Sequence, residues 1–343
     1  MSKQSSDFEA DIGKKYAVGK LTVQIEGVVA EGGFGVVFLA RNSTSQRYAL
    51  KRLYVNEEAT LNACKREIQI MSSLSSHKNM VTFVDSAINR NYKGVWEVLI
   101  LMQYYPGSCM KIMNDRSSVG LKEPEILRIF CDICEAVSRL HHCQTPILHR
   151  DLKIENILCD SSGTCVLCDF GSATARIYVP GKDERSVTEV EEDINKHTTL
   201  SHRSPEMVNL YGHKSITTKA DIWALGVTLY RLCFRTLPFG ESTLAIQTAN
   251  INIPETSPYS PGLHALIWYC LEADPDIRPD IFQVSYLSFL LANRECPVKN
   301  INVCITLWYT VYTLCYTVYT LCYTVYTLCY TVYTMCYTVY TLC

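Results

Sequence analysis

The sequence predicts an α+β fold of two lobes, a small and mostly β N-terminal lobe with one main helix and a larger, mostly helical C-terminal lobe. Apolar residues alternate as in strands over much of residues 21–102, where one helical stripe interrupts them. A buried apolar run then breaks at a Pro-Gly pair, and helical spacing prevails beyond it. Strands gathered in one part of a chain and helices in another are typical of α+β proteins.

The first expected strand leads into a glycine-rich turn. Gly32 and Gly35 match the pattern G-x-G-x-x-G-x-V, which ends at Val37, but Ala30 stands where the first glycine belongs. Gly33, at an open position of the pattern, adds flexibility. Glycine lets backbone N–H groups approach a phosphate without a Cβ in the way. We therefore expect this turn to contact phosphate groups. An ordinary glycine hairpin is the alternative for this motif taken alone.

A helix is expected over residues 57–74, because apolar residues recur there every three or four positions. Glu67 lies beside this apolar stripe, so its side chain is expected to point inward. Lys51 lies before this helix, in the segment Tyr48–Lys51. A carboxylate on the helix surface is the alternative for Glu67.

The second half of the strand-rich region ends in an apolar run that closes at Met102. Residues 103–107 contain the Pro-Gly pair and are expected to form a hinge between the lobes. Pro124 then suits the first turn of a long helix. His141 and His142 end this helix, where we expect them to cap it or to lie at the surface.

The stretch 148–173 holds two carboxylates and an amide at a spacing that phosphoryl transfer can use. Residues 149–156 match H-R-D-L-x-x-x-N, and residues 169–171 read D-F-G after an apolar run. Residues 204–206 match A-P-E with serine for alanine, and residues 220–226 match the central helix of the same pattern. In this order the motifs are specific, and the sequence resembles the eukaryotic protein kinase family.

This resemblance implies a bilobal protein-kinase fold that uses ATP and Mg²⁺. It implies that Asp151 is the base that accepts the proton of the substrate hydroxyl and that Lys153 meets the γ-phosphate. Lys51, positioned by an ion pair with Glu67, would reach the α- and β-phosphates. Lysine two residues after the base marks serine/threonine kinases in this family. Asn156 and Asp169 would hold Mg²⁺ through oxygen atoms. The expected nucleotide site comprises Ala30, Gly32, Gly33, Gly35, Val37, Ala49, Lys51, Met102, Gln103, Tyr105, Asn156 and Asp169.

Three further contacts follow from the same resemblance. Thr199 is expected to tie the substrate platform to the base and its lysine, and Asp221 to bond back to the catalytic loop. Arg278 is expected to pair with Glu206. Residues 169–206 are expected to be mobile.

Arg150 precedes the expected base, so it is placed to pair with an activating phosphate. The sequence identifies no phosphorylation site in the segment that would carry one.

Several segments carry a narrower resemblance, to the Numb-associated kinases and their adaptor-associated and BMP-inducible branch. They are Cys64–Ile68, Val95–Met102, Cys168–Thr174, Pro205–Tyr211 and Leu237–Ser242. The resemblance covers roughly residues 20–302 and implies phosphorylation of threonine on clathrin-adaptor subunits in endocytic vesicle trafficking, with the protein at coated vesicles or the plasma membrane. It also implies a helix over residues 207–214. A catalytically weak kinase-fold scaffold and a related kinase with another substrate are the alternatives.

The composition fits a globular protein with a sizeable core. Hydrophobic residues make up 48% of the 343 residues, and 32 basic residues balance 34 acidic ones to a net charge of −2. This balance, without a basic stripe, argues against a nucleic-acid partner. The N-terminus contains no apolar stretch typical of a secretory signal, so we expect a cytoplasmic protein with reduced thiols.

The 17 cysteines include Cys131-x-x-Cys134 and Cys165-x-x-Cys168, which look like a zinc pattern. The gap between these pairs exceeds the usual linker of a zinc ribbon, and the pairs fall on a helix and a strand, so no zinc site is expected.

The predicted organisation is a polar N-terminal extension (1–20), a kinase domain (21–292), a linker (293–308) and a repetitive tail (309–343). Within the domain, the N-lobe takes residues 21–102, the hinge 103–107 and the C-lobe 108–292. We expect a monomeric domain without a transmembrane segment. The tail repeats the heptad Tyr-Thr-Val-Tyr-Thr-Leu-Cys, with one methionine for leucine. An unstructured low-complexity end, a β-aggregating segment and a helix or membrane anchor are its alternative interpretations.

Overall fold

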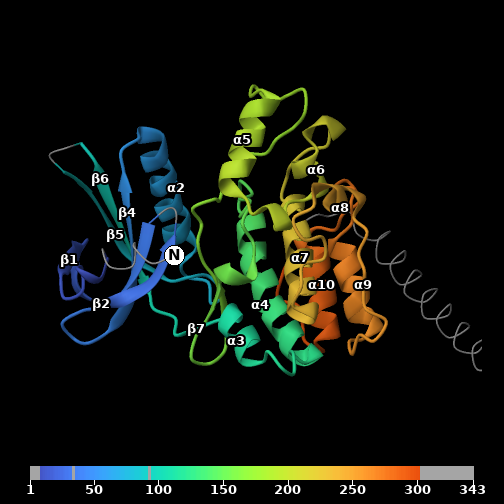
Figure 1. The fold of residues 1–343 in the computed structure, drawn as a ribbon, viewed down its shortest axis with the longest axis horizontal. Coiled ribbons are helices and arrows are strands. Elements are labelled where there is room, and N and C mark those ends of the chain that lie inside the picture. The colour runs from blue at the N-terminus through green and yellow to red at the C-terminus, as the bar shows by residue number, and fades with distance from the viewer. Residues whose placement is uncertain (1–7, 33–34, 92–93, 302–343) are drawn as a thin grey trace, which may run out of the picture. The chain divides into compact units, whose positions relative to one another are not determined.

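The computed structural model describes residues 8–32, 35–91 and 94–301. Six antiparallel strands in the order β1-β2-β3-β4-β6-β5 form the sheet of the N-terminal lobe. Figure 1 places this sheet and helix α2 on one side and the other labelled helices on the other side, which confirms the predicted two-lobed α+β fold. The strands are β1 (Lys15–Val18), β2 (Leu21–Gly32), β3 (Gly35–Arg41), β4 (Arg47–Val55), β5 (Phe83–Arg90) and β6 (Trp96–Gln103).

The two faces of this sheet have different surroundings. In β3, Val36, Phe38 and Ala40 are buried in the lobe's core, whereas Val37 between them is half-buried on the opposite face. This alternation follows from the period of two in a strand. Leu50 of β4 joins the same core. The other face is therefore the one that can meet a ligand between the lobes.

The prediction that residues 1–20 form a polar extension is wrong for their second half. Strand β1 pairs with β2, and Val18 is completely buried in the sheet core. The Asp11 carboxylate lies 2.5 Å from the buried guanidinium of Arg52 in β4. Four residues are too few for a strand period to stand out in the sequence, but pairing with β2 gives their backbone groups partners. Residues 1–7 lie outside the described residues.

Helix α2 (Glu58–Leu74) agrees with the predicted helix to within one residue. It packs against β4, β5 and β6. Of the predicted apolar stripe, Ile68 is half-buried, and the other members are buried: Leu61, Cys64, Met71 and Leu74. Glu67 is only 3% exposed, so this carboxylate faces inward as expected.

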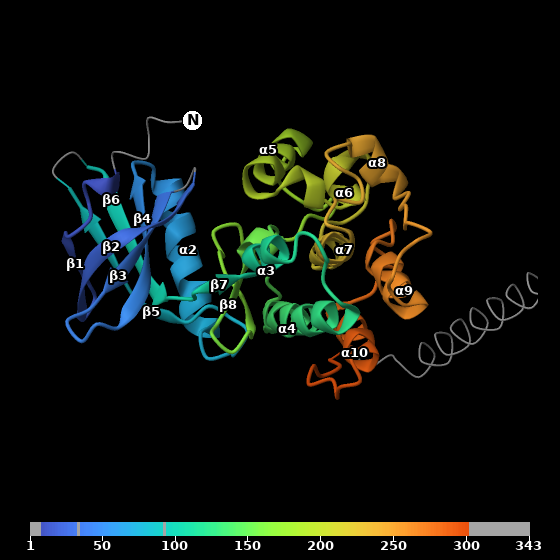
Figure 2. The ribbon, with the colours of Figure 1, turned by 60° about the horizontal axis from the view of Figure 1, so that its bottom comes forward.

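The C-terminal lobe is built around two long helices, α4 (Glu123–His141) and α7 (Lys219–Phe234). Helix α4 packs against α10 (Ile281–Leu291) and β9 (Cys165–Leu167), while α7 packs against α9 (Pro261–Cys270) (Figure 2). A three-stranded sheet, β7 (Gly107–Ser108), β8 (Ile157–Cys159) and β9 (Cys165–Leu167), faces the hinge. Within the described residues, no helix has both the length and the apolar character that crossing a membrane requires. The α-helices of this lobe are α3 (Cys109–Asp115), α4 (Glu123–His141), α5 (Val187–His197), α6 (Pro205–Val208), α7 (Lys219–Phe234), α8 (Thr243–Thr248), α9 (Pro261–Cys270) and α10 (Ile281–Leu291), and the 3-10 helices are η1 (Ile154–Asn156), η2 (Leu200–His202) and η3 (Leu210–Gly212).

Helix α7 is buried along nearly its whole length and approaches its neighbour closely at Gly226. A Cβ at this position would lie 2.7 Å from Cγ of Leu271 and 2.8 Å from Cβ of Cys270. Glycine is thus required here by close packing at the end of α9.

The predicted domain end at residue 292 is close to the end of α10. The compact unit nevertheless continues to Val298, whose side chain is 8% exposed, so the first residues of the predicted linker belong to the domain. The repetitive tail, residues 309–343, lies outside the described residues.

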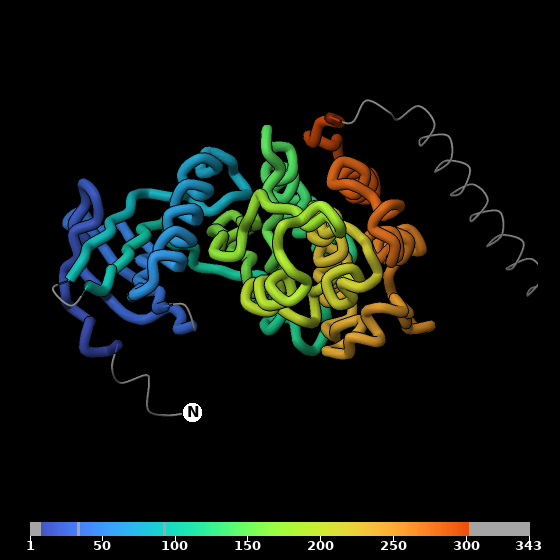
Figure 3. Tube along the Cα trace, turned by 90° about the horizontal axis from the view of Figure 1, so that it is seen from above, coloured from blue at the N-terminus to red at the C-terminus, as the bar shows by residue number. Residues whose placement is uncertain are grey.

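The two lobes are joined by hydrogen bonds as well as by the hinge. The backbone N–H of Val81 donates to Leu167 of β9 at 2.9 Å, and the N–H of Leu167 donates to Asn79 at 2.9 Å. The Asn79 side chain donates to the carbonyl of Cys165 at 2.8 Å. The strand-rich and helical regions, which lie side by side in Figure 3, are therefore held together by hydrogen bonds between residues 79–81 and β9.

The predicted pair between Arg278 and Glu206 is present and completely buried. The Arg278 Nη1 atom lies 2.8 Å and its Nη2 atom 2.9 Å from the two carboxylate oxygens of Glu206. Arg278 also donates to the carbonyls of Glu272 and Lys219 and lies over the ring of Trp223. Bidentate geometry and these additional acceptors compensate for the removal of both charges from water.

Replacement of Arg278 by alanine should destabilise the protein strongly, because Glu206 would keep a buried, unpaired charge. We expect a loss of about 3–5 kcal/mol in the free energy of unfolding. Asp276→Ala is the matched control, because Asp276 is exposed and pairs with Lys214 at the surface; it should cost no more than about 1 kcal/mol. Urea unfolding of the full chain measures both. Equal effects of the two substitutions would contradict the assigned role of the buried pair.

Candidate active site

A chain of three charged groups links the two lobes at the centre of the site. The Lys51 Nζ atom lies 2.7 Å from Oε1 of Glu67 in α2 and 3.1 Å from Oδ1 of Asp169 after β9. The ion pair predicted between Lys51 and Glu67 is therefore present. Lys51 comes from β4, so one ammonium group connects the sheet, α2 and the C-terminal lobe.

Burial and charge act in opposite directions on these groups. Burial alone would lower the pKa of Lys51, but the carboxylates of Glu67 and Asp169 outweigh it and raise this pKa above its ordinary value. For Asp169, burial would raise the pKa, but Lys51 prevails and lowers it. At neutral pH the site thus holds a permanent ammonium beside an ionised carboxylate.

A buried carboxylate holds the catalytic loop from behind. Oδ2 of Asp221 accepts from the backbone N–H of His149 at 2.7 Å, and its Oδ1 accepts from the N–H of Arg150 at 2.9 Å. This is the contact predicted for Asp221. Arg150 has φ of 68°, a left-handed backbone conformation that is unfavourable for arginine, and these two hydrogen bonds help to hold it.

The prediction that His141 caps its helix or lies at the surface is wrong. His141 is 6% exposed, and its Nε2 atom lies 2.9 Å from Oδ2 of Asp221. The side chain is drawn inward because α7 brings a carboxylate opposite the end of α4. Sequence reasoning missed this support for the loop because α4 and α7 are about eighty positions apart, and no local signal links them.

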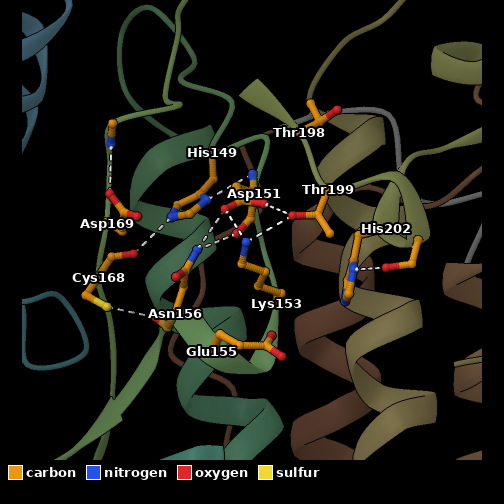
Figure 4. Close-up of polar contacts among 12 residues, drawn as sticks. His149, Asp151, Lys153, Glu155, Asn156, Cys168, Asp169, Thr198, Thr199 and His202 are labelled. Atoms are coloured by element: carbon orange, nitrogen blue, oxygen red, sulfur yellow. Dashed lines mark hydrogen bonds and ion pairs between the residues drawn. The ribbon is translucent and has the colours of Figure 1, made fainter. Parts of the chain in front are cut away.

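Asp151 lies in a network of three side chains, drawn in Figure 4. Its Oδ1 accepts from the Thr199 hydroxyl at 2.6 Å, and its Oδ2 lies 2.8 Å from Nζ of Lys153. Lys153 also donates to the Thr199 hydroxyl at 2.9 Å, which confirms the predicted tie between these residues. Nδ2 of Asn156 donates to both the carbonyl and the carboxylate of Asp151, at 2.8 and 3.2 Å. The carboxylate is therefore fixed from several sides.

The backbone at Asp169 is also left-handed, with φ of 62°. The following side chain, Phe170, is 1% exposed and packs edge-on against the ring of His149, with 5.4 Å between ring centroids. Nε2 of His149 lies 3.3 Å from the carbonyl of Cys168. These contacts place Phe170 in the core and turn the Asp169 carboxylate toward Lys51.

Asn156 and Asp169 are chemically suited to Mg²⁺. The Asp169 carboxylate is half-exposed and ionised, and the Asn156 amide nitrogen is used by Asp151, which leaves the amide oxygen for a cation. Mg²⁺ in nucleotide sites commonly takes one or two protein oxygen ligands together with phosphate oxygens. No cluster of three or more histidine, cysteine or acidic side chains suited to a metal occurs in the described part of the chain.

The predicted nucleotide residues of the N-lobe lie on the sheet face opposite the core. Val37 is paired with Lys51, and Ala49 with Met102, so these side chains share one face. Ala30 lies in β2 opposite Val37. Its strand conformation explains why alanine is accepted where the pattern has glycine.

Gly32 and Gly35 close the β2–β3 hairpin opposite each other. Gly35 has φ of 145°, and a Cβ there would lie 2.3 Å from the carbonyl oxygen of Arg52, so only glycine fits. Gly33, predicted to contact phosphate, lies outside the described residues.

At the hinge, the backbone N–H of Gln103 donates to the carbonyl of Thr82 at 2.9 Å and is not free for a nucleotide. The Tyr105 hydroxyl lies 3.1 Å from the hydroxyl of Thr82. The sequence did not indicate these contacts, because Thr82 reaches the hinge only through the β5–β6 pairing.

The segment 169–206, expected to be mobile, contains the helix α5. Its N-terminus has a capping box in which Ser186 and Glu189 exchange hydrogen bonds. Val190 and Ile194 of α5 are buried in a cluster with Tyr178, Met207 and three further residues, Leu210, Ile216 and Ala220. The cap signal Ser-x-x-Glu is present in the sequence, but the helix that follows it contains only three strongly apolar residues, Val187, Val190 and Ile194.

The sequence places Arg150 to pair with an activating phosphate. In the structure, its guanidinium already pairs with a carboxylate of α5. The Arg150 Nη1 atom lies 2.7 Å from Oδ2 of Asp193, and Nη1 of Arg185 lies 3.6 Å from the same oxygen. Oδ1 of Asp193 lies 2.9 Å from Nδ1 of His197. Burial would raise the pKa of Asp193, but these partners prevail and lower it strongly.

The helix expected over residues 207–214 is not formed. Helix α6 ends at Val208, and η3 ends before His213, whose φ of 54° is left-handed. Asn209 departs from helical geometry between them. Met207 and Leu210 pack into the cluster beneath α5, and this packing replaces a continuous helix.

Comparison with known proteins identifies the family. A family model described as protein kinase domain matches residues 23–290. The chain is 43% identical over 278 residues to the serine/threonine-protein kinase sel-5 of Caenorhabditis elegans, which covers 80% of this chain and 26% of that protein. It is 35% identical over 303 residues to actin-regulating kinase 1 of Saccharomyces cerevisiae, which covers 85% of this chain and 47% of that protein.

A probable serine/threonine-protein kinase of Dictyostelium discoideum is 43% identical over 289 residues, or 82% of this chain and 26% of that protein. The chain thus spans between about a quarter and a half of the length of these relatives. The matched region contains both lobes and the three charged residues at the centre of the site, Lys51, Glu67 and Asp169. The match to the family model and the two-lobed fold together show that the chain belongs to the protein kinase family.

Proposed function

We propose that the protein is a serine/threonine kinase that transfers the γ-phosphate of ATP to a protein hydroxyl with the help of Mg²⁺. The observation that carries this proposal is the fixed carboxylate of Asp151, held by Thr199, Lys153 and Asn156. Phosphoryl transfer depends mainly on positioning and on stabilisation of negative charge, and this network serves both.

The proposed roles follow from where each group lies. Asp151 accepts the proton of the attacking hydroxyl, and Lys153 beside it stabilises charge on the transferred phosphoryl group. Lys51, oriented by Glu67, contacts the α- and β-phosphates of the substrate ATP. Asn156 and Asp169 would hold Mg²⁺, which supplies positive charge between the phosphates.

The proposed adenine site lies under the glycine-rich hairpin, on the face of the N-lobe sheet opposite the hydrophobic core. Val37, Ala49 and Met102 supply apolar surface, with Met102 at the back of the pocket. Backbone groups of Gln103 and Tyr105 contribute polar contacts; for Gln103 this means the carbonyl, because its N–H is already used. Ala30, Gly32, Gly33 and Gly35 belong to the loop over the phosphates.

Two observations argue against a catalytically weak scaffold. The ion pair between Lys51 and Glu67 is formed, and Asp169 is directed to the same lysine. A fold that serves only as a scaffold needs neither a buried ammonium nor a strained backbone at Asp169.

We further propose membership in the Numb-associated kinase family, with threonine of a clathrin-adaptor subunit as substrate. The resemblance of the segments around Glu67, Met102 and Asp169 supports this finer assignment. Relatives named sel-5 and actin-regulating kinase 1 are compatible with it. A place at coated vesicles or the plasma membrane follows from the same substrate.

Lys51→Ala should greatly weaken binding of MgATP, because the phosphates lose their buried cation. Calorimetric titration of the full chain with MgATP measures the affinity, and a phosphorylation assay measures turnover. Lys65→Ala is the matched control, since Lys65 is an exposed lysine of α2. Unchanged ATP affinity and turnover in Lys51→Ala would refute the assigned site.

Asp151→Asn should lower kcat by about 10²–10⁴, the usual contribution of a positioned acid–base group. Asp169→Asn should instead raise the Mg²⁺ concentration needed for half-maximal activity, because an ionised ligand is lost. Initial rates over a Mg²⁺ titration distinguish the two effects, with Asp276→Asn as a surface control. Wild-type rates and Mg²⁺ dependence in both variants would show the roles to be wrong.

The acceptor residue should be threonine or serine, because Lys153 and Thr199 hold the reacting hydroxyl close to Asp151. A phenol reaches further, and a displacement of about 1 Å can lower a rate about a hundredfold. A clathrin-adaptor medium-chain peptide containing threonine should be phosphorylated, whereas its Thr→Ala version should not. Mainly phosphotyrosine in the products would overturn the acceptor class; failure of the adaptor peptide alone, with other threonine peptides phosphorylated, would remove only the adaptor substrate.

A further inference from the structure

A pocket of about 680 Å³ adjoins the proposed base. Lys153 and Thr199 form its inner wall, and both contact the carboxylate of Asp151. Glu155 and His202 lie on the side away from Asp169, as Figure 4 shows. A peptide whose hydroxyl reaches Asp151 would therefore place a neighbouring side chain in this pocket.

Among the described residues, Glu155 is the only carboxylate that lines the pocket, and it is already paired. Nη1 of Arg231, which comes from α7, lies 2.8 Å from Oε1 of Glu155 in η1. The Arg231 side chain is 20% exposed and that of Glu155 40% exposed, so both can be reached from the pocket. Considered alone in the sequence, Glu155 would attract a basic substrate residue. The tertiary structure neutralises this attraction.

The remaining charges of the pocket are positive. Lys153 and Arg235 line it together with Arg231, while Lys153 is balanced by Asp151. Arg235 donates only to main-chain carbonyls, those of Arg116 and Ser117, so its charge has no carboxylate partner among the hydrogen bonds of the described residues.

The wall formed by His202 adds no charge. Burial lowers the pKa of this side chain to about 4, so it is neutral at physiological pH. Its Nδ1 atom lies 3.1 Å from the Ser201 hydroxyl. The pocket therefore has an excess of positive charge apart from the catalytic residues.

We propose that this pocket is a substrate subsite that favours an acidic side chain near the acceptor and rejects a basic one, with Arg231 as the specificity-determining residue. The proposal rests on the kinase activity proposed above. A basic side chain would have to displace Arg231 from Glu155 and would meet Arg235. An acidic side chain joins Arg231 and Arg235 without breaking the existing pair.

Two substitutions that each remove one charge of the pair test the subsite in opposite directions. Arg231→Gln leaves Glu155 unpaired, so preference should move toward basic peptides. Glu155→Gln leaves Arg231 unpaired, so preference for acidic peptides should increase. Arg231→Glu places two carboxylates in the pocket and should reverse the preference of the wild type.

The assay uses the full chain and sets of threonine peptides in which glutamate, glutamine or arginine occupies each of the four positions before and after the acceptor. At the position that meets the pocket, we expect wild-type kcat/KM to be about tenfold higher for glutamate than for arginine, the effect of unit charges near a hydrated surface. Arg139→Gln, an exposed arginine of α4, is the control and should keep this ratio.

The ratio between peptides separates specificity from stability. A structural role for Arg231 would lower the rates of all peptides equally and leave the ratio unchanged, and this result would overturn the proposal. A wild-type preference for arginine at every position would overturn it as well. Opposite shifts in Arg231→Gln and Glu155→Gln would support it. Absence of any phosphorylated peptide with the wild-type chain would instead contradict the kinase activity, and the subsite with it.

Discussion

The geometry of the active site depends on one buried carboxylate, that of Asp221 on α7. It accepts hydrogen bonds from two consecutive backbone N–H groups of the catalytic loop and lies against His141. Burial would raise the pKa of Asp221, but these donors prevail and lower it, so the group stays ionised inside the lobe. Because hydrogen bonds to a buried charge are strong, α7 fixes the strained backbone at Arg150 and thereby the position of Asp151.

The carboxylate of Asp151 in this loop has three partners, two from the same stretch of chain and one from a distant segment. Thr199 comes from the segment before α6, Lys153 from the loop itself, and Asn156 from η1. Their common acceptor is Asp151, so a shift of any one element would misalign the carboxylate. The second support of this arrangement is electrostatic, since Asp193 of α5 supplies the negative charge opposite Arg150. Helix α5 thus connects the packing of the segment 169–206 with the catalytic loop.

Charged groups inside this fold and at its pocket are neutralised by partners of opposite charge. Lys51 lies between two carboxylates, Arg278 holds Glu206 in a bidentate pair, and Arg231 pairs with Glu155. The exposure of these pairs decides their effect. The fully buried pair stabilises the C-terminal lobe, whereas the half-exposed pair at the pocket sets the charge that an incoming substrate would meet.

The sequence by itself determined the two-lobed fold, helix α2 and the contacts among Lys51, Glu67, Asp151, Thr199 and Asp221. Apolar periodicity placed helix α2, and the ordered motifs carried the family resemblance that implied these contacts. Only the tertiary structure decided that β1 joins the sheet, that His141 turns inward, that Asp193 pairs with Arg150 and that Arg231 neutralises Glu155. Each of these contacts joins elements far apart in the sequence or too short to show a period. Their partners are chosen by packing and by the need to pair buried charges, and no local pattern records that choice.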